Sequence, residues 1–285
     1  MSSKKLVKNK SGPFPSFTLA LVVSGLGLLT FIPFYVWIYS LQSHDKSPAA
    51  IAMASMHMSR LNIFWAFPIL QASGLAALIW SYIGVLLGLM VSGKNTSWFP
   101  FKKAQFNQIH RQISLLVIGL MLIHAIATAF DAMGDNFITV FIPWQTSWKE
   151  ATLGYNLGIF ALYLAILLGP TYYLRERLGT RTWMFAHRFT LFIYILSVWH
   201  TLILGLDTSY YSWVRPFIWI IQIPLLLLLI RRLLLKPSRT GKKAPNSSQA
   251  STKAIRYGLA VLSGIVIMLI IIIVLTGHSG FIPVV

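Results

Sequence analysis

Four histidines form two pairs of nearly equal spacing in two apolar stretches of the chain. His110 and His124 are 14 positions apart, and His187 and His200 are 13 positions apart. An ionisable side chain inside a bilayer is energetically costly, so matched pairs of them indicate a function rather than packing. Imidazole is an axial ligand of haem iron, and helix bundles place such ligands on facing helices. The spacing therefore predicts two stacked bis-histidine sites. Single histidines with only a packing role would not require matched spacings.

An arginine directly follows the first histidine of each pair. These residues are Arg111 and Arg188. One interpretation is that their guanidinium groups pair with the propionates of a haem, because the planar fork of arginine suits carboxylates. The other is that they anchor the helices at the membrane surface. The sequence leaves both interpretations open.

The composition is that of a membrane protein. Of the 285 residues, 56% are hydrophobic and only 11% are charged, whereas soluble domains carry about a quarter charged residues. The formal charge of +18 does not indicate nucleic-acid binding, because the charges lie in short clusters between apolar stretches. The chain has no cysteine, which excludes disulfides, thiolate metal sites and covalent attachment of c-type haem. Any haem must therefore be b-type.

Seven apolar stretches are long enough to cross a bilayer, which takes about 20 residues. Only helices satisfy their own backbone hydrogen bonds in such an environment, apart from closed barrels. We expect an all-α integral membrane protein, with a six-helix haem-binding bundle and one additional C-terminal transmembrane helix. A basic tail over residues 1–16 precedes the first helix, and a basic flexible linker over residues 236–256 precedes the last. The expected spans are 17–41, 64–92, 107–130, 152–174, 183–206, 214–235 and 257–276.

The distribution of charge predicts the orientation of these spans. With a cytoplasmic N-terminus, every acidic residue except Glu176 falls outside, and nearly all Lys and Arg fall inside, as the positive-inside rule requires. We expect a multi-pass protein of the plasma membrane with an extracytoplasmic C-terminus. His110 and His187 then lie near the cytoplasmic surface, and His124 and His200 lie about 20 Å away along the membrane normal.

One spacing does not fit an ideal helix. Fourteen residues fall about 40° short of whole turns, but the 13 residues from His187 to His200 fall about 140° short. The two rings would not share a face. Local overwinding, a bend, or different angles of approach to the two haems would have to bring them together.

The two histidine pairs, His-x13-His and His-x12-His, resemble those of the ferric reductase-like transmembrane domain over about residues 60–235. That superfamily includes NADPH oxidases, ferric reductases, the STEAP metalloreductases and the haem subunit of the bacterial methionine sulfoxide reductase system. The resemblance implies that His110 and His187 bind an inner haem and that His124 and His200 bind an outer haem. The oxidases carry an FAD/NADPH module after the sixth helix, but here no Gly-rich nucleotide-binding turn appears. The resemblance thus implies a separate flavoprotein reductase or a membrane quinol as electron donor.

The expected function is that of a transmembrane cytochrome b with two haems. Electrons would pass from a cytoplasmic or quinol donor to an extracytoplasmic acceptor, which is ferric iron, oxygen or a redox protein. The chain would be the haem component of an oxidoreductase, in contact with lipid and with no nucleic acid. Two alternatives remain: a quinol-linked cytochrome b of another family, and a metal or proton transporter or membrane assembly factor that uses the histidines. The absence of Asp and Glu near the centre of the expected spans disfavours the transporter.

Overall fold

The computed structural model of the chain describes residues 17–44, 64–91, 103–131, 136–205 and 213–234, and a few isolated positions between 258 and 268. Every regular element of this described part is a helix. The predicted all-α architecture is therefore confirmed there. The expected basic tail, the linker and nearly all of the expected seventh helix lie outside the described residues.

Six helical segments are long and apolar enough to cross a membrane within the described part of the chain. This number agrees with the expected six-helix bundle. Short turns divide two of the six segments, so that α9 and α10 form one span and α12 and α13 form another. The helices of the spans are α1 (Phe17–Ser43), α4 (Ala66–Val91), α5 (Lys103–Phe130), α7 (Thr152–Leu168), α9 (Thr180–His187), α10 (Thr190–Leu204), α12 (Val214–Ile220) and α13 (Gln222–Leu234).

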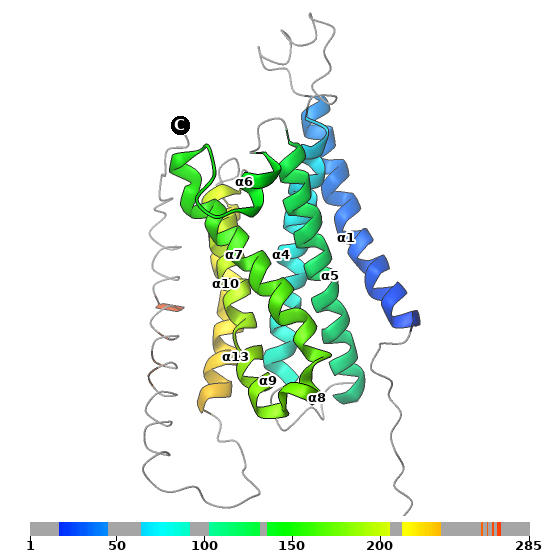
Figure 1. Cartoon of the computed structure of the whole chain (residues 1–285), viewed down its shortest axis with the longest axis vertical. Helices are drawn as coiled ribbons and strands as arrows, with labels where there is room; N and C mark the ends of the chain where they lie inside the picture. The colour runs from blue at the N-terminus through cyan, green and yellow to red at the C-terminus, as the bar shows by residue number, and fades with distance from the viewer. Residues whose placement is uncertain are drawn as a thin grey trace, which may run out of the picture.

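The spans run side by side along the long axis of the molecule, with α4 at the centre of the contacts (Figure 1). Helix α4 packs against α1, α5, α10 and α13, and α7 packs against α10. Small side chains make close packing possible on α4, where Ala72, Ser73 and Ala76 are fully buried. Close approach of backbones through small residues is how helices associate in lipid, where no hydrophobic force drives them together.

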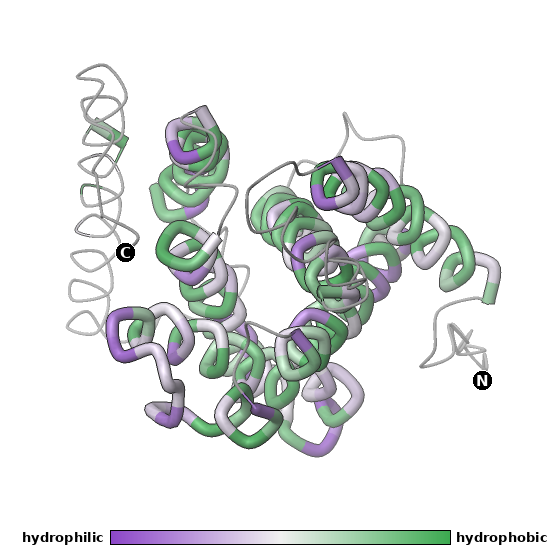
Figure 2. The backbone as a smooth tube through the Cα atoms, turned by 90° about the horizontal axis from the view of Figure 1, so that it is seen from above, coloured by the Kyte–Doolittle hydropathy of each residue, from purple (hydrophilic) through white to green (hydrophobic). Residues whose placement is uncertain are grey.

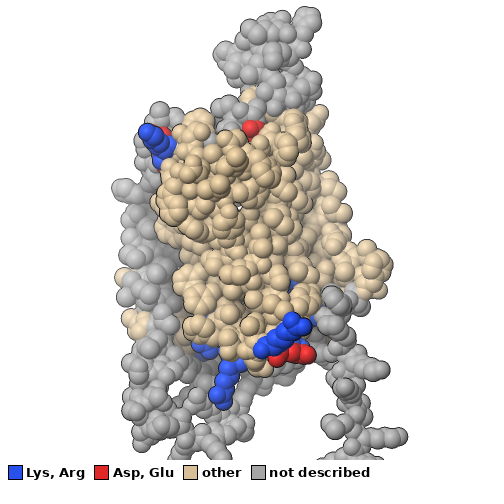
Figure 3. Space-filling view, viewed as in Figure 1, with Lys and Arg blue, Asp and Glu red and all other residues tan. Residues whose placement is uncertain are grey.

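The outer surface of the bundle is apolar. Large side chains such as Leu29 and Leu167 are about two-thirds exposed, at 67% and 68%, and Figure 2 shows mostly hydrophobic residues along the helices seen from above. Charged side chains gather at the two ends of the molecule on the face shown in Figure 3. An exposed apolar surface of this extent is stable in lipid and not in water. The chain is therefore a multi-pass membrane protein.

Short helices cap the two ends of the bundle. At one end, here called the α6 end, lie α6 (Phe137–Phe141) and η1 (Lys149–Ala151). At the other, the α8 end, lie η2 (Gly169–Tyr172) and α8 (Arg175–Leu178). Between α8 and α9, Gly179 has a φ of 78°, in the left-handed region that glycine tolerates without strain. This turn directs the chain into α9, which ends at His187.

Candidate functional site

The four predicted histidines meet in the two expected pairs. The ring centroids of His110 and His187 are 6.0 Å apart with an interplanar angle of 84°. Those of His124 and His200 are 5.8 Å apart with an angle of 89°. The first pair lies towards the α8 end and the second towards the α6 end, and all four residues are half-buried. Two helix pairs thus present facing imidazoles at two levels of the bundle.

The separation within each pair fits two ligands on opposite sides of one metal ion. A metal–imidazole bond is about 2 Å long, so two such rings have their centroids about 6 Å apart. Within the described residues, no group of three or more His, Cys, Asp or Glu side chains lies close enough to hold a metal ion. Two protein ligands suffice for haem iron, because the porphyrin supplies the other four nitrogens. The residues present therefore fit haem.

A tightened turn after His187 rotates the following helix and so helps to bring His200, 13 residues later, towards its partner His124. The amide of Arg188 bonds to the Phe185 carbonyl at 3.1 Å, and the amide of Phe189 bonds to the Ala186 carbonyl at 3.0 Å. The same three-residue step recurs from Phe192 to Phe189 at 2.9 Å. Such 3₁₀ bonding turns the chain by roughly 20° more per residue than an α-helix. The structure therefore shows local overwinding between the two histidines, which is one of the three explanations that the sequence left open.

A backbone carbonyl orients each histidine of the pair near the α6 end. Nδ1 of His124 lies 2.8 Å from the Leu70 carbonyl oxygen, and Nδ1 of His200 lies 2.8 Å from the Gly154 carbonyl oxygen. A carbonyl can only accept, so Nδ1 carries the proton and Nε2 keeps its lone pair free for a metal. This is the usual way in which a second contact fixes the tautomer and orientation of a ligating imidazole.

Glycines bring the neighbouring helices close enough for these contacts. A Cβ atom placed on Gly74 would lie 2.9 Å from Nδ1 of His124, and one on Gly158 would lie 2.7 Å from Nδ1 of His200. Both distances are shorter than side chains tolerate. A Cβ on Gly88 would lie 3.3 Å from Cε1 of His110, which is tight but less severe. Three of the four histidines therefore lie against a glycine of an adjacent helix.

These glycines were not predicted as part of the site, although the sequence contains a signal for them. Gly74 and Gly88 on α4 are 14 residues apart, the same separation as His110 and His124 on α5. Helices α4 and α5 make the most extensive contact between any two elements. Matched separations on two packed helices place each glycine at the level of one histidine.

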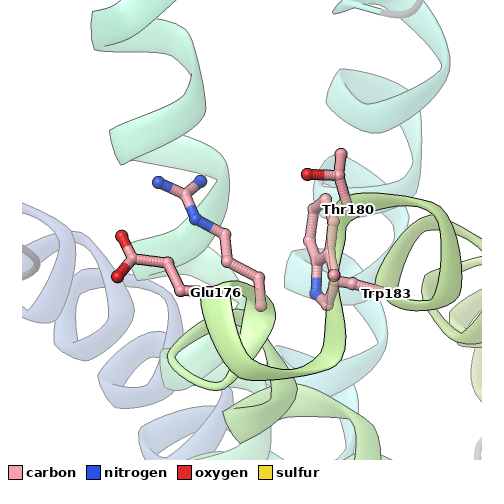
Figure 4. Close-up of a pocket in the computed structure, with 5 residues that line it drawn as sticks. Glu176, Thr180 and Trp183 are labelled. Atoms are coloured by element: carbon pink, nitrogen blue, oxygen red, sulfur yellow. The ribbon is translucent and has the colours of Figure 1, made fainter.

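His187 has a different neighbour, the indole of Trp183. The two ring centroids are 5.1 Å apart with an interplanar angle of 21°, a stacked arrangement. Trp183 also borders a cavity of about 330 Å³ at the α8 end, together with Arg175, Glu176, Gly179 and Thr180. Figure 4 shows Thr180 and Trp183 on one side of this cavity and Glu176 across from them.

The two arginines that follow the histidines lie in different surroundings. Arg111 is buried, with 8% of its surface exposed, and its guanidinium carbon is 4.9 Å from the centroid of the Tyr172 ring. Arg188 is exposed. Arg111 is thus a buried cation one residue from His110, whereas Arg188 lies on the surface of the bundle.

One comparison with known proteins gives a match. The profile of the family described as ferric reductase like transmembrane component matches residues 73–198. The matched segment contains His110, His124 and His187 and ends shortly before His200. No curated protein and no solved structure matches the chain. Domains of the matched family generally bind haem and transfer electrons within membranes. The match supports placing residues 73–198, which include α4, α5 and α7, in the ferric reductase-like transmembrane superfamily.

Proposed function

We propose that the chain is a b-type cytochrome with two haems that carries electrons across the membrane. The observation that supports this most directly is the presence of two histidine pairs, whose ring centroids are 6.0 and 5.8 Å apart. His110 and His187 would hold one haem, and His124 and His200 the other. When bound, haem supplies reversible one-electron chemistry at iron.

The protein's own contribution is to orient the ligands and keep water away. The carbonyls of Leu70 and Gly154 hold two of the rings with Nε2 available. Between the levels of His110 and His124, apolar side chains of α5, namely Ile113, Val117 and Leu120, pack against α1 and α4. Such a shell lowers the local dielectric constant and controls solvent access, which together set a reduction potential.

The charges at the two ends support a proposed direction of transfer. Arg175, Arg177 and Arg181 lie at the α8 end, so the positive-inside rule assigns this end to the cytoplasm. Electrons would then enter beside His110 and His187 and leave beside His124 and His200. A membrane potential that is positive outside favours this movement by about 2.3 kcal/mol per 100 mV for each electron. Ferric iron, oxygen or an extracytoplasmic redox protein would accept the electrons.

The electron donor would be a separate molecule. The described part of the chain consists of membrane spans and short connecting helices and contains no nucleotide-binding domain. A flavoprotein reductase could dock on the basic α8 end, where opposite charges would steer an acidic partner. A quinol would instead reach the bundle from the lipid. Either donor is compatible with the arrangement of the helices.

Haem content of the purified protein and of single variants tests the proposal. We expect about two haems per chain in a pyridine haemochrome assay. His124→Ala and His200→Ala should each lose the haem near the α6 end, and His110→Ala and His187→Ala the other, because each iron needs both of its ligands. His44→Ala is the matched control, since His44 lies exposed at the end of α1. Full haem content in all four variants would refute the assignment.

A further inference from the structure

One of the four paired histidines is held differently from the others. His110, His124 and His200 each lie against a glycine of a neighbouring helix, and the last two donate a hydrogen bond to a backbone carbonyl. Within the described part of the chain, the His187 ring makes no hydrogen bond, and its close neighbours are the rings of His110 and Trp183. The orientation of this imidazole therefore depends on aromatic contact.

Trp183 is well placed to fix that orientation. It precedes His187 by one turn of α9, the spacing at which helical side chains meet, and the two rings stack 5.1 Å apart at 21°. The Tyr172 ring makes an edge-to-face contact with the indole, at 6.0 Å and 76°. The guanidinium groups of Arg111 and Arg175 in turn lie 4.9 and 4.5 Å from the centroid of Tyr172. A connected set of contacts from α5 and η2 thus holds the His187 ring.

The same indole contacts both His187 and the cavity at the α8 end. Trp183 lines this cavity and His187 does not. Nε1 of Trp183 is buried without a hydrogen-bond partner among the described residues, so the apolar bulk of the indole, rather than a polar contact, occupies this position. Its removal would let water from the cavity approach the imidazole.

We propose that Trp183 is a positioning residue that fixes the plane of the His187 imidazole and shields the site near the α8 end from water. This inference rests on the proposed function, because it assigns a role beside one of the two haems. The angle between two axial imidazole planes sets the splitting of the iron d orbitals, and therefore the g values of the ferric, low-spin state. Water near the site stabilises the ferric form, which carries the greater positive charge, and so lowers the potential.

Substitution of Trp183 tests this role through readouts other than activity. In Trp183→Leu we expect the ferric electron paramagnetic resonance signal of one haem to shift and its midpoint potential to fall, with the second haem unchanged. Trp183→Phe keeps an aromatic face and should stay close to the wild type. Trp199→Leu is the matched control. It removes an indole beside His200 that is 47% exposed and meets the Trp219 ring edge to face, at 80°, rather than stacking on a histidine, so both signals should stay unchanged.

The outcomes separate this inference from the proposed function. If the wild type binds no haem, the proposed function fails. If the wild type binds two haems but Trp183→Leu retains both signals and both potentials, only the role of Trp183 is refuted. Should Trp183→Leu not fold, Tyr172→Leu provides the test, because it removes the edge-to-face contact with the indole and leaves the stacked pair in place. A smaller shift of the same haem supports the inference, and unchanged spectra refute it.

Discussion

At the scale of single residues, two of the glycines beside the histidines tolerate substitution as little as the histidines themselves. The three contacts are graded in severity. A Cβ would lie 2.7 Å from the nearest ring atom at Gly158, 2.9 Å at Gly74 and 3.3 Å at Gly88. The first two leave no room for a methyl group unless the imidazole moves, whereas the third needs a displacement of only a few tenths of an ångström.

We therefore predict that Gly158→Ala impairs the site near the α6 end much more than Gly88→Ala impairs the other site. Overpacking costs about 1–3 kcal/mol, and this corresponds to a loss of haem affinity of roughly 5- to 160-fold if it falls on the ligand. Measurement of haem retained during dilution or competition with an apo-haem acceptor would show it. Gly119→Ala is the control, because nothing lies within 4 Å of its Cβ position. Equal retention in Gly158→Ala and Gly119→Ala would contradict the prediction.

The histidines could be predicted from the sequence by residue type alone, whereas the residues that surround them could not. A histidine stands out in an apolar stretch because its burial is costly, but glycine is common in membrane helices and attracts no attention alone. Arg111 and Arg188 have the same sequence context, one position after a histidine, yet only Arg111 is buried. Arg188 lies in the tightened turn, and that turn could not be located from the sequence. Stacking of Trp183 on His187 likewise depends on ring orientation.

At the scale of elements, the interruption between α9 and α10 decides whether the second pair can form. The sequence correctly predicted one span over this region but not the place where its bonding changes from four-residue to three-residue steps. The change follows His187 immediately, at Arg188 and Phe189. It rotates α10 relative to α9, and His200 thereby reaches the level and the face of His124.

Insertion of one alanine between Phe189 and Thr190 should separate the two sites. The insertion adds about 100° and 1.5 Å to the start of α10, which turns His200 away from His124. His187 precedes the insertion and His110 lies on α5, so these two histidines should keep their contact. We expect one haem per chain instead of two. The same insertion after Gln145, an exposed residue between α6 and η1, should leave both. Two haems in the Phe189 insertion variant would show that α10 does not set the second site.

At the scale of the whole molecule, the match in level between the pairs is a consequence of topology. The spans that contain α5 and α10 are the third and fifth of six, so they run in the same direction through the bundle. Each histidine near the start of one span then meets the one near the start of the other. This part followed from counting apolar stretches. The central place of α4 did not, because every span is apolar enough to occupy the interior.

Because the charge of the molecule is concentrated at its ends, the two classes of electron donor should differ in how their rates of reduction depend on salt. We expect NADPH alone to reduce no haem, because the described fold contains no domain that binds it. Anaerobic stopped-flow measurements should compare NADPH alone, NADPH with a flavin reductase, and a reduced short-chain quinone. A charged protein partner would give a rate that falls steeply with ionic strength, since screening weakens steering. A neutral quinol would give a rate nearly independent of salt.

Charge reversal at the two ends provides the matched pair of variants. Arg177 and Arg181 are exposed at the α8 end, and Lys149 is exposed at the α6 end. Reduction by an acidic flavoprotein should slow about tenfold in Arg177→Glu/Arg181→Glu and remain unchanged in Lys149→Glu, because long-range attraction raises association rates by at least this factor. Reduction by the quinone should be the same in both variants. If the Lys149 variant is the slower one, the donor approaches from the α6 end and the direction of transfer is opposite to the one proposed. Rapid reduction by NADPH alone would instead place a nucleotide site on this chain.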